Sequence, residues 1–212
     1  NSAATSAVAN VNDPPVGSVS IAGTATQGQI LTASNNINDL DGIPTSGANA
    51  IRYQWKAGGL AITGATNSTY TLTQGEVGKT ITVTANYTDN FGTAESVTSA
   101  ATLAVSNTND PAVGGVTISG TATQGQTLSV SNDITDADGI PVSGANAIRY
   151  QWKADGQAIT GATASTYMLT QAEVGKAVTV TASYTDNYGT AESVTSGATV
   201  LVKLDHPPIG SV

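Results

Sequence analysis

The chain has 212 residues, of which 39% are hydrophobic, enough for one large or two ordinary folded domains. Its 7 basic and 15 acidic residues give a net charge of −8, which disfavours nucleic acid and anionic membranes as partners and favours metal cations. Cysteine is absent, and no apolar run approaches the roughly 20 residues of a membrane span, so disulfides, thiolate chemistry and direct membrane insertion are excluded.

The first half of the chain is expected to form short strands. Apolar and polar residues alternate with period 2, as where Ile81 and Val83 alternate with Thr80 and Thr82, and turn signals interrupt the alternation. In chain order, strands are predicted at residues 16–23, 28–34, 50–57, 60–63, 68–73, 79–88 and 93–105, with a short helical turn near residues 73–77.

The third predicted strand carries a tryptophan, Trp55, on the same face as Ile51 and Tyr53. An immunoglobulin-like sandwich buries a tryptophan on its third strand, whereas a sugar-stacking platform would expose it. Burial of the indole ring contributes up to about 5 kcal/mol. We therefore expect Trp55 in the core.

The second half of the chain repeats the first at an offset of 97 residues. The segment 10–17 returns at 107–114, and Trp55 is matched by Trp152. A fixed period of this length indicates tandem copies of one structural unit. We divide the chain as follows: 1–9, tail strand of a preceding repeat; 10–106, repeat 1; 107–203, repeat 2; 204–212, start of a following repeat. The pattern leaves open whether the residues before each Asn-Asp-Pro belong to the preceding or the following domain.

Seven short strands per repeat predict an all-β fold class, with two tandem immunoglobulin-like antiparallel β-sandwiches arranged end to end. The strings that begin Tyr53-Gln-Trp-Lys, Ile62-Thr-Gly-Ala and Tyr87-Thr-Asp-Asn resemble the immunoglobulin-like extender repeats of giant biofilm-associated RTX adhesins of bacteria. The Asn-Asp-Pro linkers resemble the calcium-binding junctions of cadherin-like repeats. The resemblance implies a secreted, extracellular protein of the bacterial cell surface that folds when it meets calcium outside the cell.

Acidic residues gather at the predicted turns and linkers. In an immunoglobulin-like sandwich, the entering linker and two of the strand connections share one pole. The predicted metal ligands at these poles are Asp13, Asp39, Asp41 and Asp89 in repeat 1, and Asn109, Asp110, Asp136, Asp138 and Asp186 in repeat 2. Glu76, in the turn between the fifth and sixth strands, is expected to face the pole of repeat 2 and to complete the set.

Calcium is the predicted cofactor of these groups. Carboxylates gathered at one place repel each other unless a cation lies between them. Ligands that are all oxygen suit Ca²⁺ better than the strict octahedron of Mg²⁺. The alternative is that Asp-Gly only forms a tight turn and Asn-Asp-Pro only ends a strand. The EF-hand pattern fails, because aligning Gly139 to loop position 6 places Ala145 at position 12, and the glycine-rich RTX nonapeptide is absent.

An enzymatic function is not expected. The single histidine, His206, has no counterpart in the repeats, and the acids lie at a pole rather than across a cleft. Lys56 points outward by the alternation, which disfavours an isopeptide crosslink. The sequons at Asn67 and Asn86 are missing from the second repeat, and we regard them as incidental.

The leading functional hypothesis is mechanical. A monomeric run of such extender repeats, stiffened by calcium at the linkers, would project a distal ligand-binding domain from the cell surface. Its partners would be neighbouring repeats of the same chain, with no nucleic acid and no small-molecule substrate. Two alternatives are a carbohydrate- or receptor-binding module and an accessory domain of a secreted enzyme. A binding module would expose aromatic rings, for which Phe91 and Tyr188 are the main candidates.

Overall fold

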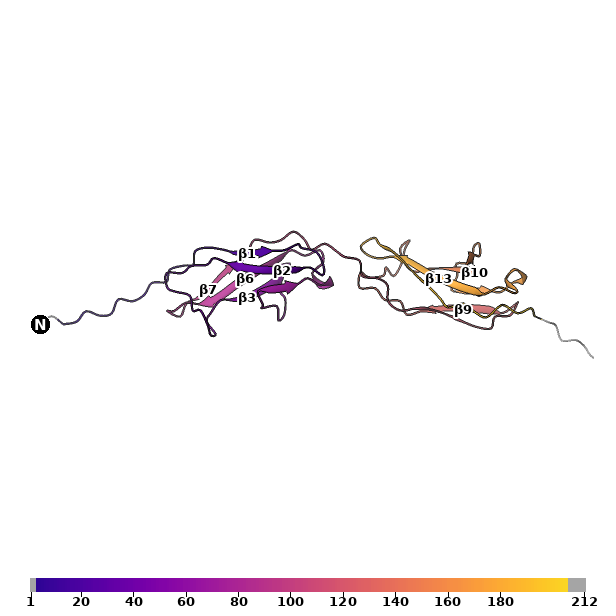
Figure 1. The fold of residues 1–212 in the computed structure, drawn as a ribbon, viewed down its shortest axis with the longest axis horizontal. Coiled ribbons are helices and arrows are strands. Elements are labelled where there is room, and N and C mark those ends of the chain that lie inside the picture. Colours follow the sequence, from indigo (N-terminus) through magenta and orange to yellow (C-terminus); the bar gives the residue numbers. More distant parts are fainter. Residues whose placement is uncertain (1–2, 206–212) are drawn as a thin grey trace, which may run out of the picture. The chain divides into compact units, whose positions relative to one another are not determined.

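The computed structural model describes residues 3–205 and confirms the predicted all-β fold of antiparallel sheets in two units. Contacts divide the chain into two compact units, Asn1–Thr108 and Asn109–Val212 (Figure 1). The boundary between them lies two residues after the predicted end of repeat 1. Residues 3–9, predicted as a tail strand, form no strand. The predicted start of a following repeat lies, from residue 206 onward, outside the described residues.

The described part of each unit contains seven strands and one turn of 3-10 helix, in the predicted order. Unit 1 contains β1 (Val19–Ala22), β2 (Ile30–Asn35), β3 (Arg52–Ala57), β4 (Leu60–Ala61), β5 (Thr69–Thr71), η1 (Gln74–Glu76), β6 (Ile81–Thr88) and β7 (Ala94–Thr98). Unit 2 contains β8 (Val116–Ser119), β9 (Thr127–Asn132), β10 (Arg149–Ala154), β11 (Gln157–Ala158), β12 (Thr166–Met168), η2 (Gln171–Glu173), β13 (Val178–Thr185) and β14 (Ala191–Thr195).

Two sheets face each other in each unit. In unit 1 the strand orders are β1-β2-β5 and β4-β3-β6-β7. In unit 2 they are β8-β9-β12 and β11-β10-β13-β14. The short fourth strand pairs with the third strand and so belongs to the sheet that contains the sixth and seventh. This is an immunoglobulin-like arrangement in which the fourth strand has moved from the first sheet to the second.

The long strand β6 supplies much of the core of unit 1. Its alternating residues Ile81, Val83 and Ala85 have no exposed surface, which confirms the alternation read from the sequence. Trp55 lies opposite Val83 in the sheet and is also fully buried. Its indole nitrogen donates to the carbonyl of Asn67 at 2.9 Å. Trp55 is therefore a core residue, and the sugar-platform interpretation is wrong for it.

The seventh strand is shorter than predicted. Residues 93–105 were expected to pair throughout, but β7 ends at Thr98. Beyond it, the hydroxyl of Ser99 accepts from the amide of Val83 at 3.0 Å, and Thr102 does the same for Ile81. Side-chain oxygens thus replace backbone carbonyls as partners of β6, and the regular ladder stops where they begin.

No helix among the described residues is both long and apolar enough to cross a membrane.

Candidate metal centre

One pole of each unit is built from three segments. In unit 1 these are the entering segment before β1, the connection from β2 to β3, and the connection from β6 to β7. The backbone joins the two connections directly, since the amide of Asn90 donates to the carbonyl of Gly42 at 3.2 Å. The acidic pole, as we call this region, therefore consists of loops that are held together before any ligand binds.

The connection from β2 to β3 carries two buried aspartates. The amide of Asp41 donates to Oδ1 of Asp39 at 2.9 Å, and the amide of Asp13 donates to Oδ2 of Asp41 at 2.8 Å. These bonds fasten the entering segment to the loop. Of the predicted ligands in repeat 1, the structure brings Asp39, Asp41 and the backbone of Asp13 together here.

The connection from β6 to β7 contributes Asp89, which is only 2% exposed. Its Oδ1 accepts from the amides of Phe91 and Thr93, both at 2.8 Å. Its Oδ2 is buried and has no partner among the described residues. An ionised oxygen that is hidden from water without a partner is costly, and a bound cation would remove that cost.

One candidate ligand of the pole, Glu95, was missed in the sequence, and so were Asn12 and Tyr87, which donate hydrogen bonds to the cluster. One carboxylate oxygen from each of Asp39, Asp89 and Glu95 lies within 4.8 Å of the others. The amide group of Asn12 donates to Glu95 at 2.8 Å, and the hydroxyl of Tyr87 donates to Oδ2 of Asp39 at 2.5 Å. Glu95 and Tyr87 lie directly opposite each other in the register of β6 and β7, which is the signal that could have revealed them.

The pole of unit 2 repeats these contacts. The amide of Asp110 donates to Asp138 at 2.9 Å, the amide of Asp138 donates to Asp136 at 2.8 Å, and Asn109 donates to Glu192 at 2.9 Å. One oxygen of Asp138 and one of Asp186 are buried without a partner among residues 3–205. The five residues predicted as ligands in repeat 2 thus lie at one pole, although among the described residues the group of three carboxylate oxygens within 4.8 Å of one another is found in unit 1 alone.

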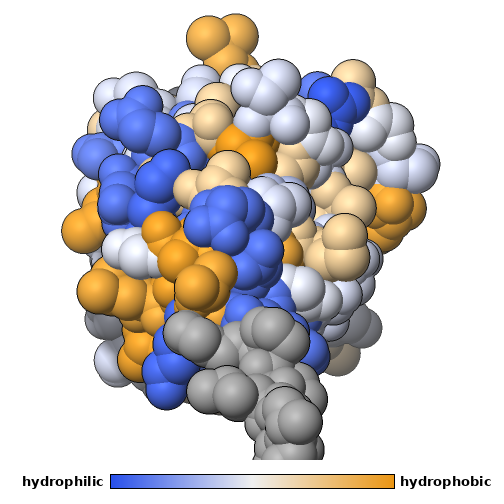
Figure 2. Space-filling view, turned by 90° about the vertical axis from the view of Figure 1, so that its right-hand side faces the viewer, coloured by the Kyte–Doolittle hydropathy of each residue, from blue (hydrophilic) through white to orange (hydrophobic). Residues whose placement is uncertain are grey.

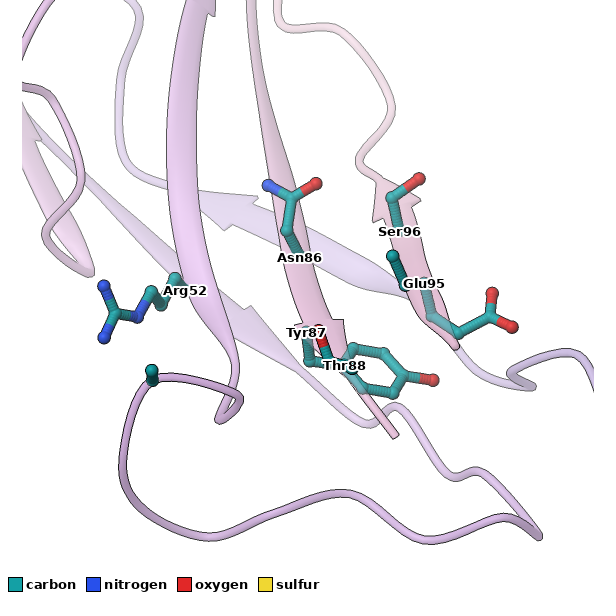
Figure 3. A pocket seen from close by; sticks show the side chains of 8 residues that line it. Arg52, Asn86, Tyr87, Thr88, Glu95 and Ser96 are labelled. Carbon is teal, nitrogen blue, oxygen red and sulfur yellow. The ribbon is translucent and has the colours of Figure 1, made fainter. Parts of the chain in front are cut away.

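No cationic side chain neutralises the cluster of unit 1. Within the described residues, Asp39, Asp41 and Asp89 make no ion pair. Figure 3 shows why Arg52 does not: its guanidinium extends to the side away from Tyr87 and Glu95. Arg52 borders a shallow hollow of about 420 Å³ whose lining also includes Tyr87 and Glu95.

The local electrostatics match a cluster of negative charge. Burial raises the pKa of Tyr87, and its bond to Asp39 and the charges of Asp39, Glu95 and Asp89 raise it further. Burial acts to raise the pKa of Asp89 as well, but the amides of Thr93 and Phe91 that donate to its carboxylate outweigh burial and lower it. Tyr87 therefore stays a protonated donor, and Asp89 stays ionised near neutral pH.

These residues fit a hard cation. Ca²⁺ binds oxygen ligands at 2.3–2.6 Å, so ligands on opposite sides of one ion are about 5 Å apart. The carboxylate oxygens of Asp39, Asp89 and Glu95 lie within that span. The oxygen-only chemistry of the set favours Ca²⁺ over zinc or copper, which prefer nitrogen and sulfur.

Glu76 lies elsewhere in unit 1. It follows β5, next to the start of β6, whereas Asp89 follows the end of that eight-residue strand. Its Oε2 accepts from the amide and the hydroxyl of Thr73, at 2.9 and 2.7 Å, and so caps η1. The structure does not bring Glu76 to the acidic pole of its own unit. Its role as a ligand toward repeat 2 stays a prediction.

Glycine is required where the two loops of the pole meet. Gly139 has φ +84°, and a Cβ there would lie 2.2 Å from Nδ2 of Asn187. Gly144 has nearly the same φ, +86°, but open space around it. We expect Gly139→Ala to destabilise unit 2 by about 1–2 kcal/mol, because the Asn187 side chain must also move away, against about 1 kcal/mol for the matched control Gly144→Ala. Chemical denaturation of both variants measures the difference, and equal losses would show that the loop contact is unimportant.

Aromatic residues do not form a binding platform in either unit. Both tryptophans are fully buried, and among the described residues the well-exposed rings are those of Phe91 and Tyr188. On the face drawn in Figure 2, apolar side chains form small groups separated by polar ones.

Comparison with known proteins identifies no family. No family model matches the chain, and no curated protein matches it. Among solved structures, one similar chain is described as the tandem Ig repeats of Dlar, with 13% sequence identity and a TM-score of 0.27. The match covers 91% of this chain and 96% of that one. At this level the likeness adds nothing to the fold already described and says nothing of function.

Proposed function

We propose that the chain is a pair of structural spacer repeats from an extracellular bacterial adhesin of the RTX type, and that each repeat binds calcium at its acidic pole. The observation that carries the proposal is the buried carboxylate oxygen without a partner at the same place in both units, on Asp89 and Asp186. A bound cation would offset the cost of burying a charged oxygen at this place in both units, which supports the proposal.

The spacer role is supported by the way the entering segment joins the pole. The amides of Asp13 and Asp110 donate to Asp41 and Asp138, so the linker before each unit is part of the same hydrogen-bonded cluster. A cation held by these aspartates would fix the linker as well as the loops. The prolines that follow, Pro14 among them, restrict the backbone further. The proposed partners are neighbouring repeats of the same chain.

A calcium titration by isothermal calorimetry tests the proposal. The wild-type chain is expected to bind at least one ion per unit. Asp186→Asn removes one negative charge and replaces an oxygen ligand by an amide, and it is expected to weaken binding in unit 2 by tenfold or more, about 1.4 kcal/mol or above.

The matched control for that variant is Asp133→Asn. Asp133 lies in the connection from β9 to β10 but joins none of the hydrogen bonds described above for the pole, and its Oδ1 accepts from the amide of Gly115 just as Asn36 accepts from Ser18 in unit 1. The control therefore removes the same charge and installs the residue that the first repeat already uses. If both variants weakened binding equally, the effect would be general electrostatics and the site assignment would be wrong.

The alternative role as a carbohydrate- or receptor-binding module has less support. Its aromatic platform would need exposed rings, and both tryptophans are in the cores. A structural role also accounts for the near-identity of the two repeats, because a spacer gains length from each copy. We propose no catalytic function.

A further inference from the structure

The chain leaves each unit through a segment that is tied to the rest of the sandwich by hydrogen bonds outside the named strands. In unit 1 this exit segment is residues 102–106. The amide of Thr102 donates to the carbonyl of Ile81 at 2.9 Å, and its hydroxyl accepts from the amide of Ile81 at 3.0 Å. The amide of Val105 donates to Lys79, and its carbonyl accepts from Gly78, both at 2.9 Å.

The last residue of the exit segment is bonded to the segment that follows β1. The amide of Ser106 donates to the carbonyl of Ala25 at 2.9 Å, and the carbonyl of Ser106 accepts from the amide of Gln27 at 3.0 Å. The bridge between Thr26 and Ser106 is parallel. The segment that follows β1 and the last segment of the unit therefore run side by side in the same direction at this bridge.

Unit 2 repeats this arrangement with its exit segment at residues 199–203. Lys203 is bonded to Ala122 and Gln124 at 2.9 and 2.8 Å, and Val202 to Lys176 and Gly175, both at 2.9 Å. The side chain of the equivalent valine, Val105 or Val202, is 2% exposed and anchors the segment in the core.

We propose that the exit segment is a mechanical clamp that lets each repeat bear tension along the chain; this rests on the proposed function, in which the repeats transmit force. The chain enters unit 1 at the acidic pole, where the Asp13 amide is bonded to Asp41, and leaves it at Ser106, beside the residues that precede β6. The two attachment points lie at opposite ends of the eight-residue strand β6. Tension on the termini therefore acts along the strands.

The direction of the tension relative to the strands determines how strongly the exit segment resists unfolding. Hydrogen bonds between neighbouring strands lie across the strand direction, so tension along the strands shears the bonds of the exit segment together instead of opening them one by one. The parallel pairing with residues 25–27 also places the continuation of β1, pulled one way from the entering segment, against the exit segment, pulled the other way. Rupture requires these bonds to break and Val105 to leave the core.

Force spectroscopy on the whole chain tests the clamp. The handles are attached through one cysteine added at each end, and they attach only there because the chain has no cysteine of its own. The first variant is Val105→Ala, and the matched control is Val83→Ala, a buried valine of β6 whose backbone is bonded to Ser99, which precedes the exit segment, rather than to residues 102–106. Unit 2 is left unchanged as the internal reference. We expect Val105→Ala to raise the forced-unfolding rate of unit 1 about tenfold, and Val83→Ala to leave it near the wild-type rate although both lower equilibrium stability.

Equal rate increases in the two variants would overturn the clamp. If Val105→Ala fails to fold, the milder Thr102→Val, which removes only the hydroxyl that Ile81 donates to, is expected to act in the same direction. The measurement is repeated with calcium and with EGTA. A wild-type chain that is insensitive to calcium speaks against the proposed calcium role, whereas the difference between Val105→Ala and its control tests the clamp under either condition.

Discussion

Withdrawal of calcium is expected to lower the melting temperature of the chain by about 10–20 °C. A ligand present at about 100 times its dissociation constant stabilises the folded state by about 2.7 kcal/mol, and each kcal/mol shifts the melting temperature of a domain of this size by about 4–8 °C. The expected source is the buried oxygens of Asp89 and Asp186, which have no hydrogen-bond partner among the described residues and would lose the proposed cation. Scanning calorimetry in calcium and in EGTA measures the shift.

Two controls separate a site from a general salt effect. Magnesium at the same ionic strength is expected to restore little of the lost stability, because a cluster of converging carboxylates suits the larger ion better. The double variant Asp89→Asn and Asp186→Asn is expected to melt at nearly the same temperature with and without calcium. If the wild-type chain melted identically in calcium and in EGTA, the calcium role would be refuted.

Replacement of Trp152 by alanine is expected to cost unit 2 about 3–5 kcal/mol, a large part of the total stability of a small domain. The side chain is fully buried, packs against Tyr167 with ring centroids 5.9 Å apart, and donates through its indole nitrogen to Ala164 at 2.9 Å. The substitution therefore leaves a cavity and an unpaired carbonyl. Denaturant titration followed by near-ultraviolet circular dichroism measures the loss.

Unit 1 serves as a reference in that experiment, since it keeps Trp55. Its transition is expected to stay in place while that of unit 2 moves to lower denaturant. As a control, Met168→Ala changes a side chain of β12 that is 60% exposed and is expected to cost well under 1 kcal/mol. A small effect for Trp152→Ala would mean that the core tolerates a large void, contrary to the packing described above.

The fold could be read from the sequence where one face of a strand is buried. Period-2 alternation predicted the inward residues of β6, and the tryptophan of the third strand was correctly placed in the core. The end of β7 could not be predicted, because Ser99 and Thr102 are compatible with a strand in propensity and are distinguished only by what their hydroxyls bond to. Likewise, the sequence does not indicate which of the two sheets β4 joins, because that depends on tertiary packing.

The candidate site was predictable in part. Asp39, Asp41 and Asp89 flank turns, and the topology of a sandwich places those turns at one pole. Glu95 was missed because it lies inside a strand, where an acid normally faces water; its position next to the pole follows from its register with Tyr87. Glu76 was assigned by its turn, but Thr73 three residues before it marks a capping box, a local role that competes with metal binding.

Every sheet in residues 3–205 is formed by strands of a single unit, and this affects how the number of repeats can change in evolution. None of the described strands pairs with a strand of the other unit, and the exit segment of unit 1 completes the sandwich before Asn109 begins the next. A crossover between the two near-identical coding segments would therefore insert or delete one whole module and leave no orphaned strand edge. Length can vary in steps of 97 residues without a new folding problem.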